Sequence, residues 1–375
     1  MASIETMQVR AWQESPGACN QTSVKEQVDS PPVVASLIDP LSADWDRLVA
    51  SNPASNIFQS AAWSRVLSET YGHKPFYLHF SQLGRTVALL PFMEVSSPFT
   101  GRRGVSLPFS DFCRPLTYGP LHPDVIVTEL SQLARKQNWK YFELRDAPNF
   151  RSFAKPVTKF YGHRLDLTAG PQELFGRFAS AVRRGIRKGE RSGITVRATG
   201  AKEAIRQFYA LHVRTRRRHG VPPQPSSFFS KIYEHVVKPG LGFVVLAEKG
   251  SRLLAGAVFF RWRENAVFKY GASDERLQEF RANNLVMWEG IKHLAGTGAK
   301  VLHFGRTEVQ NAGLRRFKLA WGAEEENLEY FRFDPVSAQW LTGQRKVPGF
   351  ASAVFSRMPL AGNRLIGTIF YPHMD

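Results

Sequence analysis

The stretch that decides the fold runs from residue 266 to residue 322 and reads AVFKYGASDERLQEFRANNLVMWEGIKHLAGTGAKVLHFGRTEVQNAGLRRFKLAWG. It opens with the β-forming run Ala266–Tyr270, and a polar loop follows. Apolar side chains then recur at helical spacing at Leu285, Trp288, Ile291 and Ala295. The next run of β formers is Val301–Phe304. A strand, a helix and a strand within this length predict a crossover unit with parallel strands.

The last part of the stretch, from Gly313 to Gly322, is interpreted as a further strand after a glycine turn. Side chains alternate between the two faces of a strand. We therefore expect Phe317 to pack inward and Lys318 to face a cleft between two domains.

Three short motifs occur in order along this stretch. They are Asn-Asn-Leu-x-x-Trp-Glu at 283–289, Phe-Gly-Arg-Thr at 304–307, and Gly-x-x-x-Phe-Lys-x-x-x-Gly at 313–322. Together they resemble the Fem peptidyltransferases and the Fem-related, BioF2-like acyltransferases of the GNAT type. The resemblance extends over residues 35–335 and is sharpest after residue 270. One position departs from it, because His303 stands where Fem-like proteins usually carry Asp.

The resemblance implies an α/β (α+β) fold of two tandem GNAT-like domains, each a mixed sheet flanked by helices. A weak internal repeat agrees with it, since the hairpin signal around Gly84 recurs around Gly250, and Lys140–Arg145 is echoed by Lys300–Arg306. We expect four segments, listed here with their bounds: a flexible tail (1–32), an N-terminal GNAT-like domain (33–165), a C-terminal GNAT-like domain (166–340) and an amphipathic tail (341–375).

The composition is that of a globular intracellular protein. The chain has 375 residues, which is enough for two domains with substantial cores. No apolar run is long enough to span a membrane, and no secretory signal is recognisable. Two cysteines provide neither a disulfide framework nor a four-cysteine zinc site. We expect a cytoplasmic protein without a metal site.

Positive charge is concentrated in one part of the chain. The net charge is +18, and residues 183–218 contain twelve Lys/Arg against two Glu, a balance of 12 − 2 = +10. A long helix is predicted to begin near Pro171, with Arg184, Arg187, Lys188 and Arg191 on one face. Such a face attracts phosphates, nucleic acid or anionic lipid. The alternative is a face that is merely solvated.

The C-terminal tail mixes apolar and basic residues. Between Val347 and Tyr371 the pattern predicts two short amphipathic helices, interrupted at Pro359. They either pack against the second domain or lie on a membrane surface. The partners expected are therefore an anionic, phosphate-bearing small-molecule or lipid-linked acceptor, tRNA, and the membrane surface.

Candidate catalytic residues follow from the needs of acyl transfer to an amine. The chain has no Gly-x-Ser-x-Gly elbow, so direct attack by the amine is expected rather than a covalent acyl-enzyme. Lys318 and Arg306 are predicted to stabilise the oxyanion or a phosphate, and Asp111 to orient or deprotonate the amine. The alternatives are a surface lysine, a structural ion pair and an Asx turn.

The donor is expected at the loop and helix start between Ser273 and Asn284. In GNAT folds the donor pyrophosphate rests on backbone N–H groups at this helix start, although here Arg281-Ala282-Asn283-Asn284 replaces the usual glycine-rich signature. Simple helix capping is the alternative for the two asparagines. The remaining candidates for donor or substrate binding are Tyr270, Trp288, Arg315 and Phe317, of which Tyr270 and Trp288 are also candidates for the core.

These observations favour a GNAT/Fem-type acyltransferase. It is expected to transfer an acyl or aminoacyl group to an amine of an acceptor related to the cell envelope, peptidoglycan or exopolysaccharide. The donor, acyl-CoA or aminoacyl-tRNA, is a substrate rather than a bound cofactor. Two alternatives remain: an acyl-CoA-dependent N-acetyltransferase acting on a nucleotide sugar, and a non-catalytic module that binds RNA or anionic lipid.

Overall fold

The computed structural model describes residues 31–343 and 350–375. Residues Val33–Asp375 form one compact unit, which contains every element named below. The predicted N-terminal tail lies almost wholly outside the described residues, and so do residues 344–349 of the predicted C-terminal tail. None of the described helices is both long enough and apolar enough to cross a membrane.

The first half of the chain is rich in short strands. Its elements are β1 (Val34–Ile38), α1 (Ala43–Ser51), η1 (Ile57–Gln59), α2 (Ala61–Tyr71), β2 (Lys74–Pro75), β3 (Tyr77–Gln82), β4 (Arg85–Leu90), β5 (Met93–Ser97), β6 (Gly101–Val105), β7 (Leu116–Thr117), α3 (Pro123–Lys136), β8 (Phe142–Arg145), η2 (Pro148–Phe150) and β9 (Thr158–Asp166).

The second half alternates helices and longer strands. Its elements are α4 (Pro171–Arg177), α5 (Ser180–Arg191), β10 (Thr195–Thr199), α6 (Lys202–Arg218), α7 (Ser226–Ile232), the π-helix η3 (Tyr233–Val237), β11 (Gly242–Lys249), β12 (Arg252–Trp262), β13 (Asn265–Ser273), η4 (Glu275–Phe280), α8 (Ala282–Gly296), β14 (Val301–His303), β15 (Thr307–Glu308), α9 (Ala312–Leu319), β16 (Glu324–Asp334), β17 (Gln339–Trp340), α10 (Phe350–Arg357), α11 (Leu360–Phe370) and η5 (Tyr371–His373).

One mixed sheet runs through both halves. In the described part of the chain it has 13 strands, ordered β10-β11-β12-β13-β14-β9-β16-β8-β6-β5-β2, with β15 and β17 beside this path. The predicted crossover is confirmed, because β13 and β14 are parallel neighbours joined through α8. At the centre, β9 of the first half pairs with β14 of the second, while β16 of the second half pairs with β8 of the first. This exchange ties the halves together by backbone hydrogen bonds.

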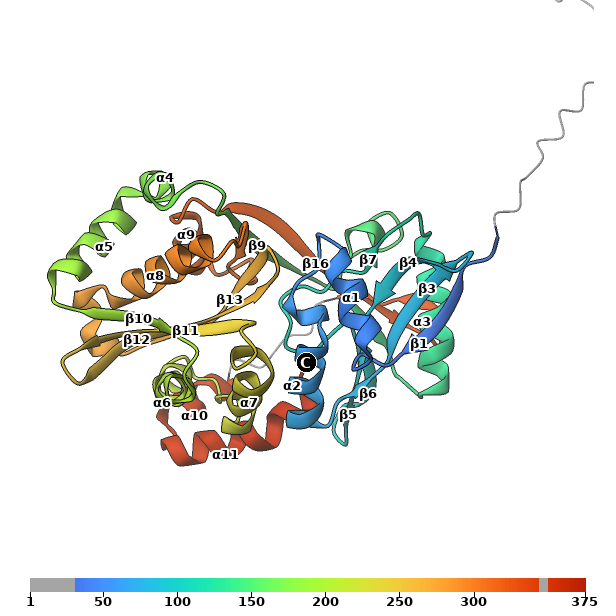
Figure 1. Ribbon diagram of the computed structural model, residues 1–375. Helices are drawn as coiled ribbons and strands as arrows, with labels where there is room; N and C mark the ends of the chain where they lie inside the picture. Colours follow the sequence, from blue (N-terminus) through green and yellow to red (C-terminus); the bar gives the residue numbers. More distant parts are fainter. Residues whose placement is uncertain (1–30, 344–349) are drawn as a thin grey trace, which may run out of the picture. The chain divides into compact units, whose positions relative to one another are not determined.

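Helices cover both faces of the part of the sheet formed by β10–β13. Figure 1 shows α4, α5, α8 and α9 over one face and α6, α7, α10 and α11 over the other. The apolar stripe predicted for the segment that begins at Pro171 is buried, as shown by Leu174, Phe178, Val182 and Ile186 of α4, α5 and the residues between them. On the opposite face, the aromatic side chains of α6 and α7 pack with Trp63 of α2, so this core also joins the two halves. The fold is thus the mixed α/β arrangement expected from the sequence.

Two predictions of secondary structure are wrong. The helix expected from Pro171 is two helices, because Phe178 is extended and the N–H of Ala179 donates to the carbonyl of Ala320. The strand expected over 313–322 is the helix α9, whose first turn is capped by the side chain of Asn311 accepting the Leu314 N–H at 3.0 Å.

Candidate functional site

A largely apolar cleft lies where β13 and β14 separate. The two strands pair at three positions, the last being Val267 with His303. Beyond this point β13 continues to Ser273 paired with β12 along one edge, while the edge that faced β14 is free of any described strand. Beside this free stretch is a cavity of about 260 Å³. Its lining comes from α6 (Thr215, Arg218), His219, β12 (Gly256, Ala257), β13 (Phe268, Gly271, Ala272, Ser273), α8 (Asn283, Val286, Met287) and α9 (Leu314, Phe317).

A β-bulge in β13 sets Lys269 apart from its neighbours. Phe268 pairs with Phe259 and Tyr270 with Val258, so Lys269 has no partner on β12. A bulge of this kind redirects one side chain out of the alternating pattern. The ammonium of Lys269 lies 2.9 Å from a carboxylate oxygen of Asp111 and donates to the carbonyl of Phe109 at 2.7 Å. The bulge therefore joins a strand of the second half to a loop of the first.

The loop that carries Asp111 is strained. Leu107 and Phe109 have φ values of 64° and 57°, a region that residues other than glycine rarely adopt. Strain of this kind is maintained where the surrounding structure fixes a functional group in place. The Tyr330 hydroxyl donates to the Asp111 carbonyl at 2.7 Å and holds the end of the loop.

Asp111, Lys269, Arg306, Lys318 and Tyr330 form a group that we call the charged cluster. The Arg306 guanidinium donates to the Tyr330 hydroxyl at 2.9 Å, and its Nε lies 4.0 Å from Asp111. Lys318 is 3% exposed and donates to the carbonyls of Gly305 and Arg306 at 2.9 and 3.0 Å. An ammonium has three N–H donors, so one donor of Lys318 is left for a further acceptor.

Two pKa values in the charged cluster are strongly perturbed. Burial by itself raises the pKa of Asp111. The nearby charges of Lys269 and Arg306 outweigh this effect, so the pKa is lowered to about 2. Burial lowers the pKa of Lys318 to about 8, although Asp111 opposes the change. A carboxylate of such low pKa is a weak base, so its low pKa favours an orienting role for Asp111 over a proton-accepting one.

His303 adjoins this cluster. Its ring centre lies 4.0 Å from that of Phe112, with the two rings tilted by 40°, and its Nδ1 accepts the Gly305 N–H at 2.9 Å. The other ring nitrogen therefore carries the proton and lies 3.2 Å from a carboxylate oxygen of Glu326. Burial lowers the pKa of His303, which keeps the ring neutral at neutral pH.

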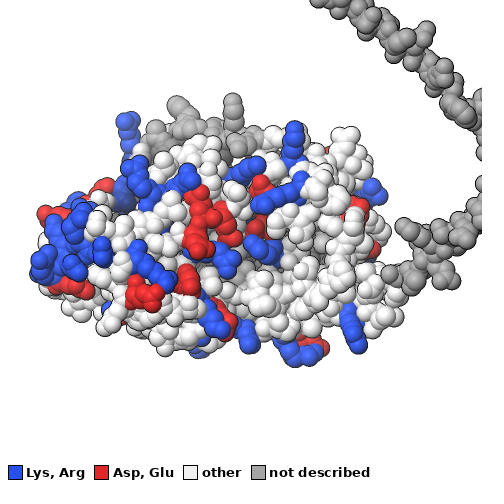
Figure 2. Space-filling model, turned by 90° about the horizontal axis from the view of Figure 1, so that it is seen from above, with Lys and Arg blue, Asp and Glu red and all other residues white. Residues whose placement is uncertain are grey.

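A basic pocket adjoins the cleft at the start of α8. It has a volume of about 710 Å³. Its lining comes from α5 (Ala181, Val182, Arg184, Gly185, Lys188), Arg281, Asn284 of α8, Gly313, Arg316 and Phe317 of α9, and Ala320. Phe317 lines both cavities, so the cleft and the basic pocket are neighbours. Figure 2 shows Lys and Arg side chains gathered at the end of the molecule that α5 occupies.

The start of α8 is suited to an anion. Arg281 precedes the helix in the left-handed conformation, with φ at 57°, and provides no side-chain cap. A helix of 15 residues presents its first N–H groups and the positive end of its dipole there. Asn283 and Asn284 lie within the first turn rather than before it, so the capping interpretation is wrong. Asn284 instead packs against Gly185 of α5.

Some predicted residues lie outside these cavities. Tyr270 contacts the rings of His212, Phe228 and Phe229, and Trp288 is 8% exposed against Phe175 and Phe178, so both belong to the core. Arg315 pairs with both carboxylate oxygens of Glu325 at 2.6 and 2.7 Å. The Arg187 guanidinium lies over the Phe175 ring, 5.5 Å from its centre, and is not among the lining residues of the basic pocket.

The orientation predicted for Lys318 is wrong. Phe317 lines the cleft, and Lys318 is turned into the protein, because consecutive helical residues are about 100° apart rather than on opposite faces. Among the residues that the sequence interpretation missed, Lys269 had a visible signal, namely a lysine within a buried apolar strand. Arg281, Arg316 and Tyr330 carried no comparable signal.

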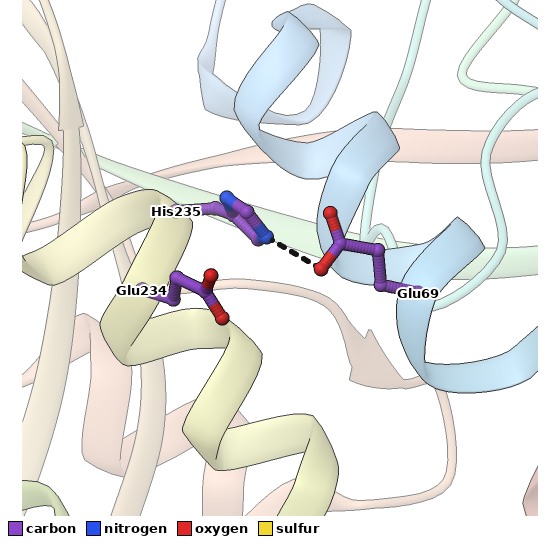
Figure 3. Close-up of side chains that lie close together, drawn as sticks. All are labelled: Glu69, Glu234 and His235. Atoms are coloured by element: carbon purple, nitrogen blue, oxygen red, sulfur yellow. Dashed lines mark hydrogen bonds and ion pairs between the residues drawn. The ribbon is translucent and has the colours of Figure 1, made fainter.

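Three side chains elsewhere have the spacing of metal ligands. Glu69 of α2, Glu234 and His235 of η3 each place one ligand atom within 4.8 Å of the others (Figure 3). Lys231 already supplies a cation there, with its ammonium 2.6 Å from Glu69 and 2.8 Å from Glu234. His235 lies 2.9 Å from the same oxygen of Glu69. The group is therefore an ion-pair bridge between two helices and gives no basis for a metal site.

Comparisons with known proteins relate this part of the chain to a known family of domains. Residues 176–325 match the model of the acetyltransferase (GNAT) domain. This part of the chain is thus similar to an acetyltransferase (GNAT) domain. The match contains α5, α8, α9 and every residue named above in the cleft lining. The protein is thus an acyltransferase, as expected, and a GNAT donor such as acyl-CoA is a substrate rather than a resident cofactor.

Solved structures support a Fem-related fold. The crystal structure of FemX is similar with a TM-score of 0.64 at 14% identity, covering 79% of this chain and 96% of that one. A tandem GNAT protein from the clavulanic acid biosynthesis pathway gives 0.51 at 11% identity, covering 81% and 99%. L-PGS from Bacillus licheniformis gives 0.50 at 12% identity, covering 85% and 98%. These identities establish the fold alone. A comparison with curated protein sequences finds no match.

Proposed function

We propose that the protein transfers an acyl or aminoacyl group from a phosphate-bearing donor to an amine of a cell-envelope acceptor by direct attack. The observation that carries this proposal is the pairing of the basic pocket with the cleft. The donor's phosphates occupy the pocket at the start of α8, and its acyl end reaches the cleft past Phe317. The basic pocket can bind the phosphates of either CoA or a tRNA 3′ end, and the cleft can hold one small acyl group.

The charged cluster supplies the chemistry of the proposed reaction. As the amine attacks, negative charge develops on the acyl oxygen, and a fixed donor that faces it lowers the barrier. Lys318 has one N–H to spare after its bonds to the carbonyls of Gly305 and Arg306. Asp111, which remains ionised, keeps the ammonium of Lys269 and the guanidinium of Arg306 in position.

The acceptor and the place of action also belong to the proposal. FemX and L-PGS share the fold, and the resemblance of the sequence motifs to the Fem peptidyltransferases implies an acceptor of the cell envelope. We therefore favour a phosphate-bearing, lipid-linked acceptor of the envelope, modified on the cytoplasmic side of the membrane. Acyl-CoA transfer to a nucleotide sugar is the second candidate, favoured by the small volume of the cleft.

A donor screen with the purified protein tests the proposal. Thiol release from a panel of acyl-CoAs is measured beside transfer of a labelled amino acid from charged tRNA, each with amine acceptors. Transfer from one donor class is expected, and at donor concentrations below saturation it should fall when Arg184 and Lys188 are both replaced by Gln. No transfer from either class, or transfer that this replacement leaves unchanged, would overturn the proposal.

A further inference from the structure

The C-terminal helix α11 turns an apolar face away from the protein. Leu365 and Ile369, one helical turn apart, are 62% and 51% exposed. The opposite face is buried: Asn363 is 0% and Tyr371 4% exposed, and a Cβ at Gly367 would lie 2.0 Å from the carbonyl of Pro223. The helix is therefore fixed to the body by one face, while Leu365 and Ile369 on the other face are exposed. Figure 1 shows α11 at the lower edge of the molecule.

The sequence of the C-terminal segment carries charge of one sign before its last residue. From residue 342 to residue 374 the sequence contains Arg345, Lys346, Arg357 and Arg364 and no Asp or Glu. The first acid is Asp375, which pairs with Arg103 at 2.7 Å and is thus neutralised. Among the described residues, α10 and α11 carry Arg357 and Arg364 and no acid, so the apolar stripe of α11 is complementary to an anionic lipid surface.

A second arginine-lined pocket lies between α11, α10 and α6. It has a volume of about 420 Å³ and is lined by Arg214, Arg217 and Arg218 of α6, Ser273, Asp274, Glu275 and Arg276, and Ser356 and Leu360 of the C-terminal helices. Its two acids are engaged, Asp274 with Arg252 and Arg276, and Glu275 with Arg218. Within the described residues, the side chains of Arg214 and Arg217 have no hydrogen-bond or ion-pair partner, so they are available to a phosphate.

This pocket is next to the cleft. Arg218 and Ser273 line both, so a group held by Arg214 and Arg217 lies at the side of the cleft away from the basic pocket of α5 and α8. The cleft is thus flanked by two basic sites. One of them borders the outward apolar helix.

We propose that α11 rests on an anionic membrane surface, with Leu365 and Ile369 entering the headgroup boundary and Arg214 and Arg217 binding lipid phosphate. The membrane contact is independent of the reaction. That the bound phosphate belongs to the acceptor rests on the proposed function, and it explains how a lipid-linked amine would reach a cleft in a protein whose described helices do not span the membrane.

Vesicle flotation tests the contact. The full chain is mixed with vesicles of phosphatidylcholine alone or of phosphatidylcholine with phosphatidylglycerol, at low and high salt. Flotation is expected only with the anionic vesicles and should fall with salt. The double variant Leu365→Gln/Ile369→Gln should reduce the partition coefficient by about tenfold or more. Arg214→Gln/Arg217→Gln should reduce it and flatten its salt dependence.

Two matched variants control for loss of apolar surface and of charge elsewhere. Leu37→Gln removes a side chain that is 58% exposed on β1, and Lys136→Gln/Lys155→Gln removes two exposed cations of the first half. Both controls should float like the unchanged chain. The proposal would be overturned if the control variants lost flotation as much as the α11 and α6 variants do. It would also be overturned if the α11 and α6 variants kept their melting temperatures and floated like the unchanged chain. Flotation needs no turnover, so a chain that floats but transfers nothing contradicts the proposed reaction and leaves the membrane contact supported.

Discussion

At the scale of the residue, Phe317 and Lys318 are adjacent in the chain but have different surroundings. Phe317 lines the cleft and the basic pocket, whereas Lys318 is buried, with two of its N–H groups bound to carbonyls. The short helix α9 causes this difference, because one residue of helix turns a side chain by about 100°. A buried ammonium with one free donor is a suitable group to meet a developing negative charge.

Lys318→Met should lower kcat by about 10²-fold, because one charge-stabilising donor is lost. The melting temperature should change little, since burying the ammonium is itself costly and the methionine fills a similar volume. Steady-state kinetics with the donor found by screening measure the effect. Lys292→Met, at an exposed lysine of α8, is the matched control and should keep full activity. Full activity in Lys318→Met would remove Lys318 from the mechanism.

The pH dependence of the unchanged protein should contain a limb that belongs to Lys318. Burial lowers its pKa from 10.5 to about 8, so the folded protein loses this proton first as pH rises. The charged form is the active one in this account, so kcat should fall above about pH 8. Between pH 8 and 10.5 the unfolded chain binds more protons at this site, which makes the free energy of unfolding rise with pH. Lys318→Met should show neither the fall of kcat above about pH 8 nor the rise in the free energy of unfolding. If the variant retains both, another group causes them.

Asp111→Asn should destabilise the fold by about 3–5 kcal/mol, because it leaves the buried ammonium of Lys269 without its carboxylate. The pKa of Asp111 is lowered from 3.8 to about 2, so its contribution to stability is complete above pH 3.8 and is lost as pH falls toward 2. Urea unfolding measures the change. The double variant Asp111→Asn/Lys269→Met should regain part of the lost stability. If the double variant is no more stable than Asp111→Asn alone, the pair is not the cause.

At the scale of the element, α8 connects the core to the candidate site. Its start meets the basic pocket, and its middle packs on the sheet, where Gly290 lies against the Phe259 ring. The sequence predicted this helix and the parallel strands beside it well, because Leu285, Trp288 and Ile291 repeat at a clear period. It did not predict α9, because eight residues that mix basic and apolar side chains also fit a short strand, and the only helix signal is the capping Asn311 in front of them.

Gly290→Ala and Gly296→Ala test the packing of α8 as a matched pair. A Cβ at Gly290 would lie 2.3 Å from the Phe259 ring, so the methyl group should destabilise the protein by about 1–3 kcal/mol. A Cβ at Gly296 meets nothing within 4 Å, so that change should be neutral or stabilise by up to about 1 kcal/mol. Thermal unfolding distinguishes them. Equal stabilities of the two variants would contradict the packing described for this helix.

At the scale of the whole molecule, the charged cluster depends on a fold in which the halves exchange strands. Asp111 comes from a loop of the first half, while Lys269, Arg306 and Lys318 come from the second, and β9 and β16 cross between them. The sequence motifs indicated Asp111, Arg306 and Lys318 separately. They did not indicate that a bulge at Lys269 brings them together, because a bulge depends on the register between β12 and β13. The boundary at 165/166 between two tandem domains stays a prediction.

The central claim is that the donor's phosphates bind in the basic pocket, and α5 offers a matched test of it. Arg184 and Lys188 line the pocket, whereas Arg187 stacks on Phe175 and Arg191 is exposed on the same helix. Arg184→Gln/Lys188→Gln and Arg187→Gln/Arg191→Gln remove the same charge from one helix, so long-range electrostatics change alike.

The decisive measurement is the dissociation constant of the donor for both double variants over a range of salt concentrations. The account predicts that Arg184→Gln/Lys188→Gln weakens binding by about tenfold or more and flattens the salt dependence, while Arg187→Gln/Arg191→Gln binds like the unchanged protein. Equal weakening in both variants, or none in either, would contradict the placement of the donor's phosphates at the start of α8.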